Sequence, residues 1–142
     1  MTDTVSDLME ASLLRVFNER DAQRRARAID TTYAPDVRCT DDLGTCVGRE
    51  ALEAKVRALQ SHMDGMVLAK ASPVYQTRGF GYLAWTLWPE DGDPVETGFD
   101  AAIVCNDLIA EFYTVITKGV PVLPSSAANR VDSESTRLDG GS

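Results

Sequence analysis

The sequence predicts an α+β domain in which helices come first and a run of antiparallel strands follows. Apolar residues recur at helical spacing through the first half of the chain, whereas from Met66 onward they alternate with a period close to two. Turn signals divide this second half into consecutive segments, as expected for strands joined by hairpins. Helices that are segregated in sequence from an antiparallel sheet define the α+β class.

Three helices are predicted in the first half. The apolar face of the first consists of Val5, Leu8, Met9, Leu13, Val16 and Phe17. The second begins after Asn18 and carries Ile29 and Tyr33 on one face. It ends before Pro35, because the residue that precedes a proline is disfavoured in the helical region. The third opens at Gly48, and its apolar stripe consists of Leu52, Val56, Leu59 and Met63.

Extended segments make up the rest of the predicted domain. Two short ones, at residues 37–40 and 45–47, flank an acidic turn that contains Asp41 and Asp42. Longer strands are predicted in chain order at residues 67–76, 79–88, 95–105 and 108–117. The Asn106-Asp107 pair between the last two is a tight hairpin signal, because both residue types tolerate a positive φ.

Composition limits the classes of partner. The 142 residues are 44% hydrophobic and 25% charged, which is typical of one globular domain with a core of its own. The net charge of −8 argues against nucleic acid and against an anionic membrane surface, because both need a basic face. No apolar run is long enough to span a bilayer and no leader pattern opens the chain, so the expected compartment is the cytoplasm.

Cysteine and histidine are too few and too scattered to predict a metal site. The three cysteines, Cys39, Cys46 and Cys105, match no zinc spacing, and His62 is the single histidine. We therefore expect reduced thiols and neither a metal ion nor another cofactor.

A change in composition divides the chain into a domain at residues 1–117 and a tail at residues 118–142. The tail is rich in Pro, Ser, Asp and Gly and offers little to bury, so we expect it to be flexible. Alternatively, it could dock on a partner subunit through its short apolar stretch, which contains Val120, Val122 and Leu123.

Four segments carry a resemblance to a known family. They are Phe17-Asn18-Glu19-Arg20-Asp21, Tyr33-Ala34-Pro35-Asp36-Val37, Gly48-Arg49-Glu50-Ala51-Leu52, and the stretch from Gly98-Phe99-Asp100 to Ile109. In this order and spacing, the chain resembles SnoaL-like proteins of the nuclear transport factor 2-like superfamily over residues 5–117. The resemblance implies a cystatin-like cone, in which a curved antiparallel sheet wraps round three helices and encloses a largely apolar pocket. It also implies a homodimer that forms through the outer face of the sheet.

The resemblance extends distantly to ketosteroid isomerase and implies a set of site residues. Asp41 falls at the position of its general base, Asp100 at that of an acid that donates to the substrate oxyanion, and Tyr33 at that of a supporting tyrosine. Phe17 replaces the main oxyanion tyrosine and has no hydroxyl to donate, so steroid isomerisation does not carry over literally. The implied pocket lining consists of Phe17, Leu52, Val56, Leu59, Trp85, Phe112, Thr114 and Ile116.

A physical argument for the two aspartates stands beside this resemblance. Strand alternation puts Asp100 on one face with the small residues Gly98 and Ala102, which leaves space for a ligand there. An apolar pocket raises the pKa of a carboxyl group toward the range useful for proton transfer. The alternative is structural: Asp100 could accept hydrogen bonds from a neighbouring Tyr or Trp, and Asp41 or Asp42 could cap a turn.

Two functions from different classes remain open. The first is a small isomerase, cyclase or dehydratase that moves protons on a hydrophobic carbonyl compound without a cofactor, with Asp41 as base and Asp100 as acid. The second is a non-catalytic domain that binds a hydrophobic molecule or only dimerises. Both include a ligand pocket or an apolar interface, but only the enzyme requires Asp41 and Asp100 to face one cavity.

Overall fold

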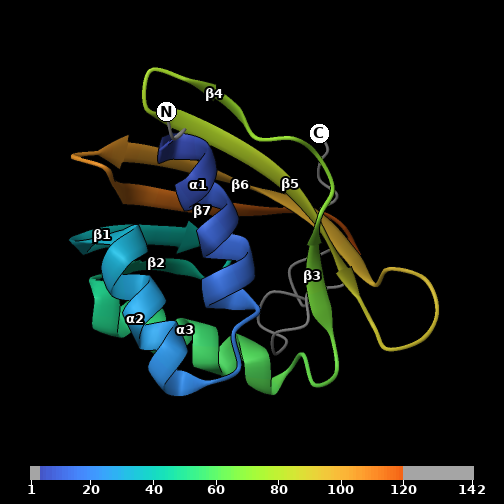
Figure 1. Cartoon of the computed structure of the whole chain (residues 1–142). Helices are drawn as coiled ribbons and strands as arrows, with labels where there is room; N and C mark the ends of the chain where they lie inside the picture. The colour runs from blue at the N-terminus through green and yellow to red at the C-terminus, as the bar shows by residue number, and fades with distance from the viewer. Residues whose placement is uncertain (1–3, 120–142) are drawn as a thin grey trace.

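The computed structural model describes residues 4–119 and contains helices followed by a sheet (Figure 1). The helices are α1 (Thr4–Ala11), its π-helical continuation η1 (Ser12–Phe17), α2 (Ala22–Thr32) and α3 (Arg49–Ser61). The strands are β1 (Tyr33–Asp41), β2 (Gly44–Val47), β3 (Val67–Lys70), β4 (Tyr75–Thr77), β5 (Phe80–Trp88), β6 (Glu96–Cys105) and β7 (Leu108–Gly119). The predicted α+β class is confirmed, and so are three helical segments, if α1 and η1 are taken as one.

The strands described form one curved, open sheet in the order β2-β1-β7-β6-β5-β3, with β4 also paired to β5. The expectation of a wholly antiparallel sheet is wrong at one place, because β1 and β7 run parallel. The last strand returns between β6 and β1, which come from the two halves of the chain. Hairpin signals report only pairs of consecutive strands, so they contain no information about this long-range pair.

Two element boundaries differ from those predicted. Tyr33 leaves α2 and opens β1, with an extended backbone at φ −117° and ψ 148°. The segment predicted as one strand at residues 67–76 is divided into β3 and β4, and both pair with β5. Pro73 lies in the interruption, where its missing N–H would leave a gap in a continuous ladder.

The hairpin signal between β6 and β7 is confirmed by the backbone. Asn106 and Asp107 adopt φ values of 53° and 63°, as a tight turn between twisted strands requires. A bulge close to the turn then shifts the register by one residue, so that Asp100 lies opposite Thr114 and Ala102 opposite Phe112. The position of the candidate site residues therefore depends on the turn and on this bulge together.

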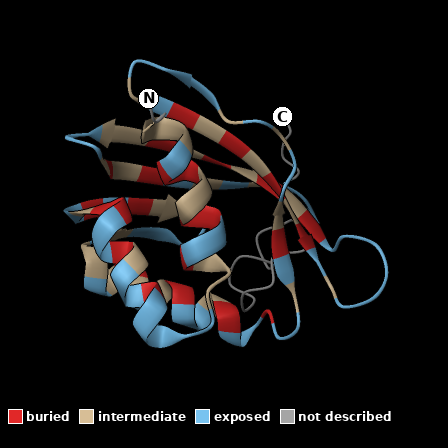
Figure 2. Cartoon of the chain, viewed as in Figure 1, coloured by how far each residue is buried: buried red, intermediate tan, exposed pale blue. Residues whose placement is uncertain are grey.

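The helices cover one face of the sheet, and the core lies between the two layers (Figure 1). Burial alternates along β5 and β6, as Figure 2 shows, because every second side chain points toward the helices. The fully buried side chains come from both layers and include Leu13, Val16, Leu52, Val56, Leu83, Leu87, Ile109 and Phe112.

The end of the predicted domain falls within the last strand. β7 continues to Gly119, so Lys118 and Gly119 belong to the sheet and not to a tail. The rest of the tail predicted at residues 118–142, including its alternative docking stretch at residues 120–123, lies outside the described residues.

Candidate active site

A cavity lies between η1, the inner face of α3 and the helix-covered face of the sheet. Its volume is about 80 Å³, which is several times the roughly 10–15 Å³ that one water molecule needs. Its apolar wall includes Leu13, Phe17, Leu52, Leu59, Met63, Leu68, Leu87, Phe112 and Ile116. Its ionisable side chains, apart from the Cys39 thiol, are Asp41, Asp42, Lys55, Glu96 and Asp100. The cavity is therefore apolar, with a few charged groups at fixed places, which is typical of a small-molecule site.

Asp100 is the most deeply placed carboxyl group of the cavity, with 4% of its surface exposed. The indole Nε1–H of Trp85 and the hydroxyl of Thr114 both donate to its Oδ1, each at 3.1 Å. Its Oδ2 accepts no hydrogen bond from the described residues. Burial raises the pKa of Asp100 to about 7, while the hydrogen bonds from Thr114 and Trp85 act in the opposite direction. Near neutral pH this carboxyl group can therefore either give or take a proton.

Gly98 allows Trp85 to reach Asp100. Trp85 on β5 lies opposite Gly98 on β6, and the indole lies directly over the glycine. A Cβ at position 98 would come within 2.5 Å of Trp85 Cζ2, and closer still to the carbonyl oxygen of Val115. Only a residue without a side chain leaves this space, so Gly98 is part of what positions the donor to Asp100.

Asp41 lies at the end of β1 and is held by two donors. Its Oδ2 forms an ion pair with Lys55 Nζ at 2.8 Å, and its Oδ1 accepts the backbone N–H of Leu43 at 2.9 Å. The turn-capping alternative is thus present, since the bond to Leu43 closes an Asx turn. The ion pair is partly shielded, with 20% of the Lys55 side chain and 12% of the Asp41 side chain exposed.

Sheet register brings the two aspartates close together although 59 positions separate them in the sequence. Thr40 lies opposite Tyr113 in the parallel pair, so Asp41 comes next to Thr114, which in turn pairs with Asp100. The three side chains form a row across β1, β7 and β6. Neighbouring strands are about 4.8 Å apart, so the Cα atoms of the two aspartates are roughly 10 Å apart. A ligand with a single ring is long enough to contact both ends of this row.

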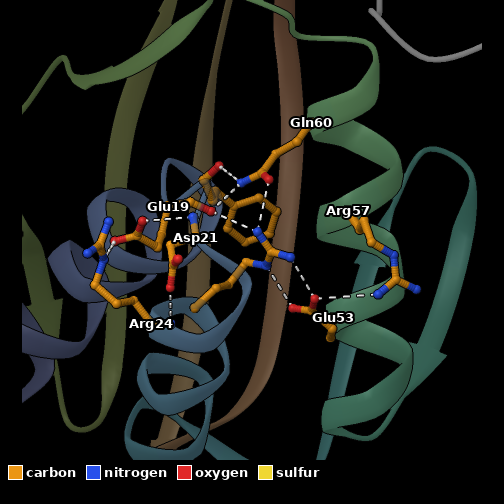
Figure 3. Close-up of polar contacts among 8 residues, drawn as sticks. Glu19, Asp21, Arg24, Glu53, Arg57 and Gln60 are labelled. Carbon is orange, nitrogen blue, oxygen red and sulfur yellow. Dashed lines mark hydrogen bonds and ion pairs between the residues drawn. The ribbon is translucent and has the colours of Figure 1, made fainter.

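A polar network that includes Glu53 and Gln60 of α3, both labelled in Figure 3, ties this helix to the rest of the helical layer. Arg25 donates from Nε and Nη2 to the two carboxylate oxygens of Glu53, at 2.8 and 2.7 Å, and from Nη1 to Gln60 Oε1 at 3.0 Å. Gln60 in turn donates to the backbone carbonyls of Phe17 and Glu19, at 3.0 and 2.8 Å. This network fixes α3, and with it Lys55, relative to the end of η1 that carries Phe17.

Solved structures with the same architecture identify the fold. A candidate isomerase of the SnoaL-like family from Agrobacterium tumefaciens superposes with a TM-score of 0.75 over 81% of this chain and 98% of that chain, at 22% identity. The chain has the SnoaL-like fold. A candidate polyketide cyclase from Sinorhizobium meliloti matches at a TM-score of 0.62 and 15% identity, over 80% of this chain and 99% of that one. A candidate ketosteroid isomerase from Kribbella flavida matches at a TM-score of 0.61 and 15% identity, over 92% of this chain and 90% of that one. At these identities the likeness concerns the fold and not a shared reaction.

Comparisons of sequence alone identify no relative. No protein-family model matches the chain, and no curated protein matches it. The SnoaL-like fold is thus identified from the three-dimensional arrangement of the chain.

The SnoaL-like fold brings most of the predicted site residues to one cavity. Asp41 and Asp100 both line it. Of the residues predicted as lining, the cavity wall contains Phe17, Leu52, Leu59, Trp85, Phe112, Thr114 and Ile116. Val56 is fully buried in the core and lies outside the cavity wall.

Tyr33 also lies outside the cavity wall. It is fully buried, its hydroxyl forms a hydrogen bond with that of Ser12, and it meets the ring of Phe112 edge-on at 6.0 Å between centroids. Desolvation raises the pKa of Tyr33 well above its usual value, so the hydroxyl stays protonated. The structure places Tyr33 behind the wall, where it supports Phe112, and it forms no hydrogen bond to either aspartate.

Several residues of the site were not anticipated from the sequence. Lys55, Glu96 and Cys39 line the cavity. Burial raises the pKa of the Cys39 thiol to about 12. Lys55 lies three positions after Leu52 on the predicted third helix, so helical spacing could have put it near the apolar face. Glu96 shares the inward face of β6 with Asp100, and strand alternation could have indicated it.

In residues 4–119, no three His, Cys, Asp or Glu side chains are grouped so that they could hold a metal ion. No helix in the same range is both long and apolar enough to cross a bilayer.

Proposed function

We propose that this chain binds a small apolar molecule bearing a carbonyl group and moves a proton on it, with Asp100 as the acid–base group. The observation that carries the proposal is the position of Asp100 at the buried end of an apolar cavity. One carboxylate oxygen is held by two donors, and the other accepts no hydrogen bond from the described residues. A carboxyl group with a pKa of about 7 is suited to proton transfer near neutral pH.

The proton transfer follows from this arrangement. Asp100 as carboxylate takes a proton from the carbon next to the substrate carbonyl, and the electron pair of the C–H bond moves to the carbonyl oxygen as an enolate. Return of the proton to another carbon completes an isomerisation. Its transfer to a departing hydroxide completes a dehydration. Attack of the enolate on a second carbonyl of the same molecule forms a ring, and the new alkoxide oxygen takes the proton from Asp100. Each outcome balances without an oxidant or reductant.

The hydrogen bonds favour Asp100 over Asp41 as the base. The sequence predicts Asp41 as base and Asp100 as acid, but both oxygens of Asp41 already accept a donor, from Lys55 and from the backbone of Leu43. A proton acceptor needs a lone pair directed at the substrate, and of the two aspartates only Asp100 has an oxygen, Oδ2, that accepts no hydrogen bond from the described residues. We therefore propose Asp100 for the transfer and leave Asp41 to the ion pair with Lys55.

Hydrogen–deuterium exchange tests the proposal. Cyclic enones and β-keto esters are incubated with the protein in D₂O, and NMR measures exchange of the protons next to the carbonyl. Asp100→Asn should slow exchange by about 10²-fold or more, the usual contribution of a general base. The control is Asp36→Asn, at an exposed position of β1 outside the cavity, which should exchange like the native protein.

The outcomes separate the two classes of function. Equal exchange in the native protein and Asp100→Asn would remove Asp100 from the mechanism. Ligand binding with no exchange at all would favour the non-catalytic binding domain, in which the donors on Asp100 serve only to satisfy a buried carboxyl group.

We also propose that a second copy of the chain packs on the outer face of the sheet. Phe99 and Tyr82 stack there with 5.0 Å between ring centroids, and Tyr113 and Val115 are each 41% exposed. Phe99 lies opposite Val115 in the sheet, so these side chains form one continuous apolar surface. Surfaces of this kind on a small protein are usually covered by a partner.

A further inference from the structure

One cationic side chain of the cavity, that of Lys55, has no role in the proton transfer proposed for Asp100. Lys55 lines the same cavity as Asp100, and its Nζ donates to Asp41 Oδ2 at 2.8 Å. Asp41 is held in turn by the backbone N–H of Leu43. A lysine anchored in this way keeps its ammonium group in one place, whereas a free lysine on a surface samples many rotamers.

Proton abstraction by Asp100 creates an oxyanion, which needs a hydrogen-bond donor or a cation close by. The neutral donors at the buried end are already engaged, because Trp85 and Thr114 both donate to Asp100. Phe17 has no donor group. Lys55 is the one cationic side chain among the described residues that line the cavity. An ammonium group has three N–H donors, and one of them serves Asp41, so two remain for a ligand.

The position of Lys55 in the cavity also suits contact with an oxyanion. Asp41 and Asp100 lie at the two ends of the row across β1, β7 and β6, with Cα atoms roughly 10 Å apart. Lys55 comes from α3, above the Asp41 end of this row. A carbonyl compound between them can direct its oxygen toward Lys55 and its acidic C–H toward Asp100. Apolar walls formed by Leu52, Leu59 and Phe112 strengthen any charge interaction in this space.

We infer that Lys55 is a catalytic residue that donates a hydrogen bond to the enolate oxygen, so that the substrate class is carbonyl compounds that pass through an oxyanion intermediate. The inference rests on the function proposed for Asp100. In the step, the C–H proton moves to Asp100 Oδ2, the electron pair moves to the oxygen, and Lys55 keeps all its protons. Asp100 becomes neutral as the oxyanion forms, so the oxyanion does not face a negatively charged Asp100.

A phenolate that mimics the enolate tests this role without turnover. The background variant is Asp100→Asn, since an amide stands in for the neutral carboxyl group that faces the intermediate. 4-Nitrophenol is titrated at a pH at which it is ionised in solution, and its absorbance reports the bound phenolate. 4-Nitrotoluene, which has nearly the same shape and no charge, measures the pocket itself in a parallel titration.

Lys55→Met in this background should weaken nitrophenolate binding by about tenfold or more, as expected for loss of a charged hydrogen bond. It should leave nitrotoluene binding within about twofold. Lys55→Gln can still donate to Asp41 and serves if Lys55→Met impairs folding; it should lose the preference for the phenolate in the same way. Lys70→Met is the matched control, because Lys70 is also ion-paired, to Glu10, but lies outside the cavity. It should change neither affinity.

Two results would overturn the inference. One leaves the function proposed for Asp100 intact, and the other overturns that function as well. If nitrotoluene binds equally to all variants and the preference for nitrophenolate survives Lys55→Met, then Lys55 does not bind the oxyanion and the function of Asp100 is untouched. If nitrotoluene binds to none of the proteins, the cavity is not a ligand site, and the proposed function is lost together with the role of Lys55.

Discussion

The indole N–H of Trp85 donates to Oδ1 of Asp100 at 3.1 Å from the neighbouring strand, with its ring over the backbone of Gly98. This single contact joins three features of the site. The aspartate is buried, a donor stabilises one of its oxygens, and a glycine makes the approach possible. Its consequences for pKa, stability and ligand binding can each be measured.

Replacement of Asp100 should change how stability depends on pH. Burial raises the pKa of Asp100 from 3.8 to about 7, so between these values the native state holds a proton that the unfolded chain has released. Protonated Asp100 therefore contributes up to about 4 kcal/mol to the free energy of unfolding below about pH 4, and this contribution is lost as the pH rises to about 7. Urea unfolding of the native protein and Asp100→Asn, at several pH values, should show a difference that falls across this window. Asp36→Asn is the control, and a difference independent of pH would contradict the raised pKa.

Removal of either donor to Asp100 should raise its pKa further. The hydrogen bonds from Thr114 and Trp85 lower the pKa against the effect of burial. Thr114→Val keeps the side-chain shape, Trp85→Phe keeps an aromatic ring, and each loses one donor, so we expect an upward shift of the Asp100 pKa on the order of one unit. Carbon-13 NMR of the aspartate carboxyl groups measures it. Thr97→Val removes a hydroxyl whose hydrogen-bond partner among residues 4–119 is Thr117, on the outer face, and it should leave the titration of Asp100 unchanged.

A methyl group at position 98 should displace the indole. The added Cβ of Gly98→Ala would lie 2.5 Å from Trp85 Cζ2, and the backbone of β7 on the other side cannot yield easily. We expect a loss of about 1–3 kcal/mol of stability, as for other overpacked sites. A shift in Trp85 fluorescence should accompany it, and Trp88→Phe as the background makes Trp85 the sole emitter. Unchanged fluorescence and stability would show that the indole does not depend on this glycine.

Loss of Arg25 should destabilise the fold far more than loss of its neighbour on α2. Only 3% of the Arg25 side chain is exposed, and it donates to Glu53, Gln60 and the Glu19 carbonyl. Arg25→Met removes the two hydrogen bonds to the Glu53 carboxylate and the one to Gln60 Oε1, and we expect a cost of about 3–5 kcal/mol. Arg24→Met removes a side chain that is 65% exposed, so its unfolding midpoint should barely change. Equal midpoints for the two variants would contradict the role assigned to the buried network.

The outer face of the sheet should govern self-association. Phe99→Asp places a charge in the middle of the apolar surface formed with Tyr82 and Val115. If two copies meet there, light scattering should find a dimer for the native protein and a monomer for the variant at micromolar concentration. Gln23→Asp adds the same charge on exposed α2 and should leave the dimer intact. A native monomer, or a dimer that survives Phe99→Asp, would contradict this interface.

Much of the local structure could be predicted because it depends on neighbours in sequence. The period of apolar residues located α3, and Asn106-Asp107 located the turn between β6 and β7. Tyr33 was assigned to the wrong element because helical spacing continues through it. Its extended backbone is decided by pairing with Ile109 of β7, which no local pattern reveals.

The site could be predicted only in part, for the same reason. Motif spacing and strand alternation indicated Asp41 and Asp100, and both line the cavity. Lys55 was missed because a charged residue beside an apolar stripe is usually solvated. Its importance depends on an ion pair with Asp41, which lies 14 positions earlier in the chain.

The sequence by itself determined the α+β class, the hairpins and the face of β6 that carries Asp100, since these depend on side-chain period and turn chemistry. The tertiary structure alone decided that β7 inserts in parallel beside β1 and so aligns Asp41, Thr114 and Asp100 in one row. It also decided that Trp85 lies over Gly98 and that Lys55 faces the cavity. Such contacts form between segments far apart in the chain, so their geometry follows from packing and register and cannot be obtained from local pattern.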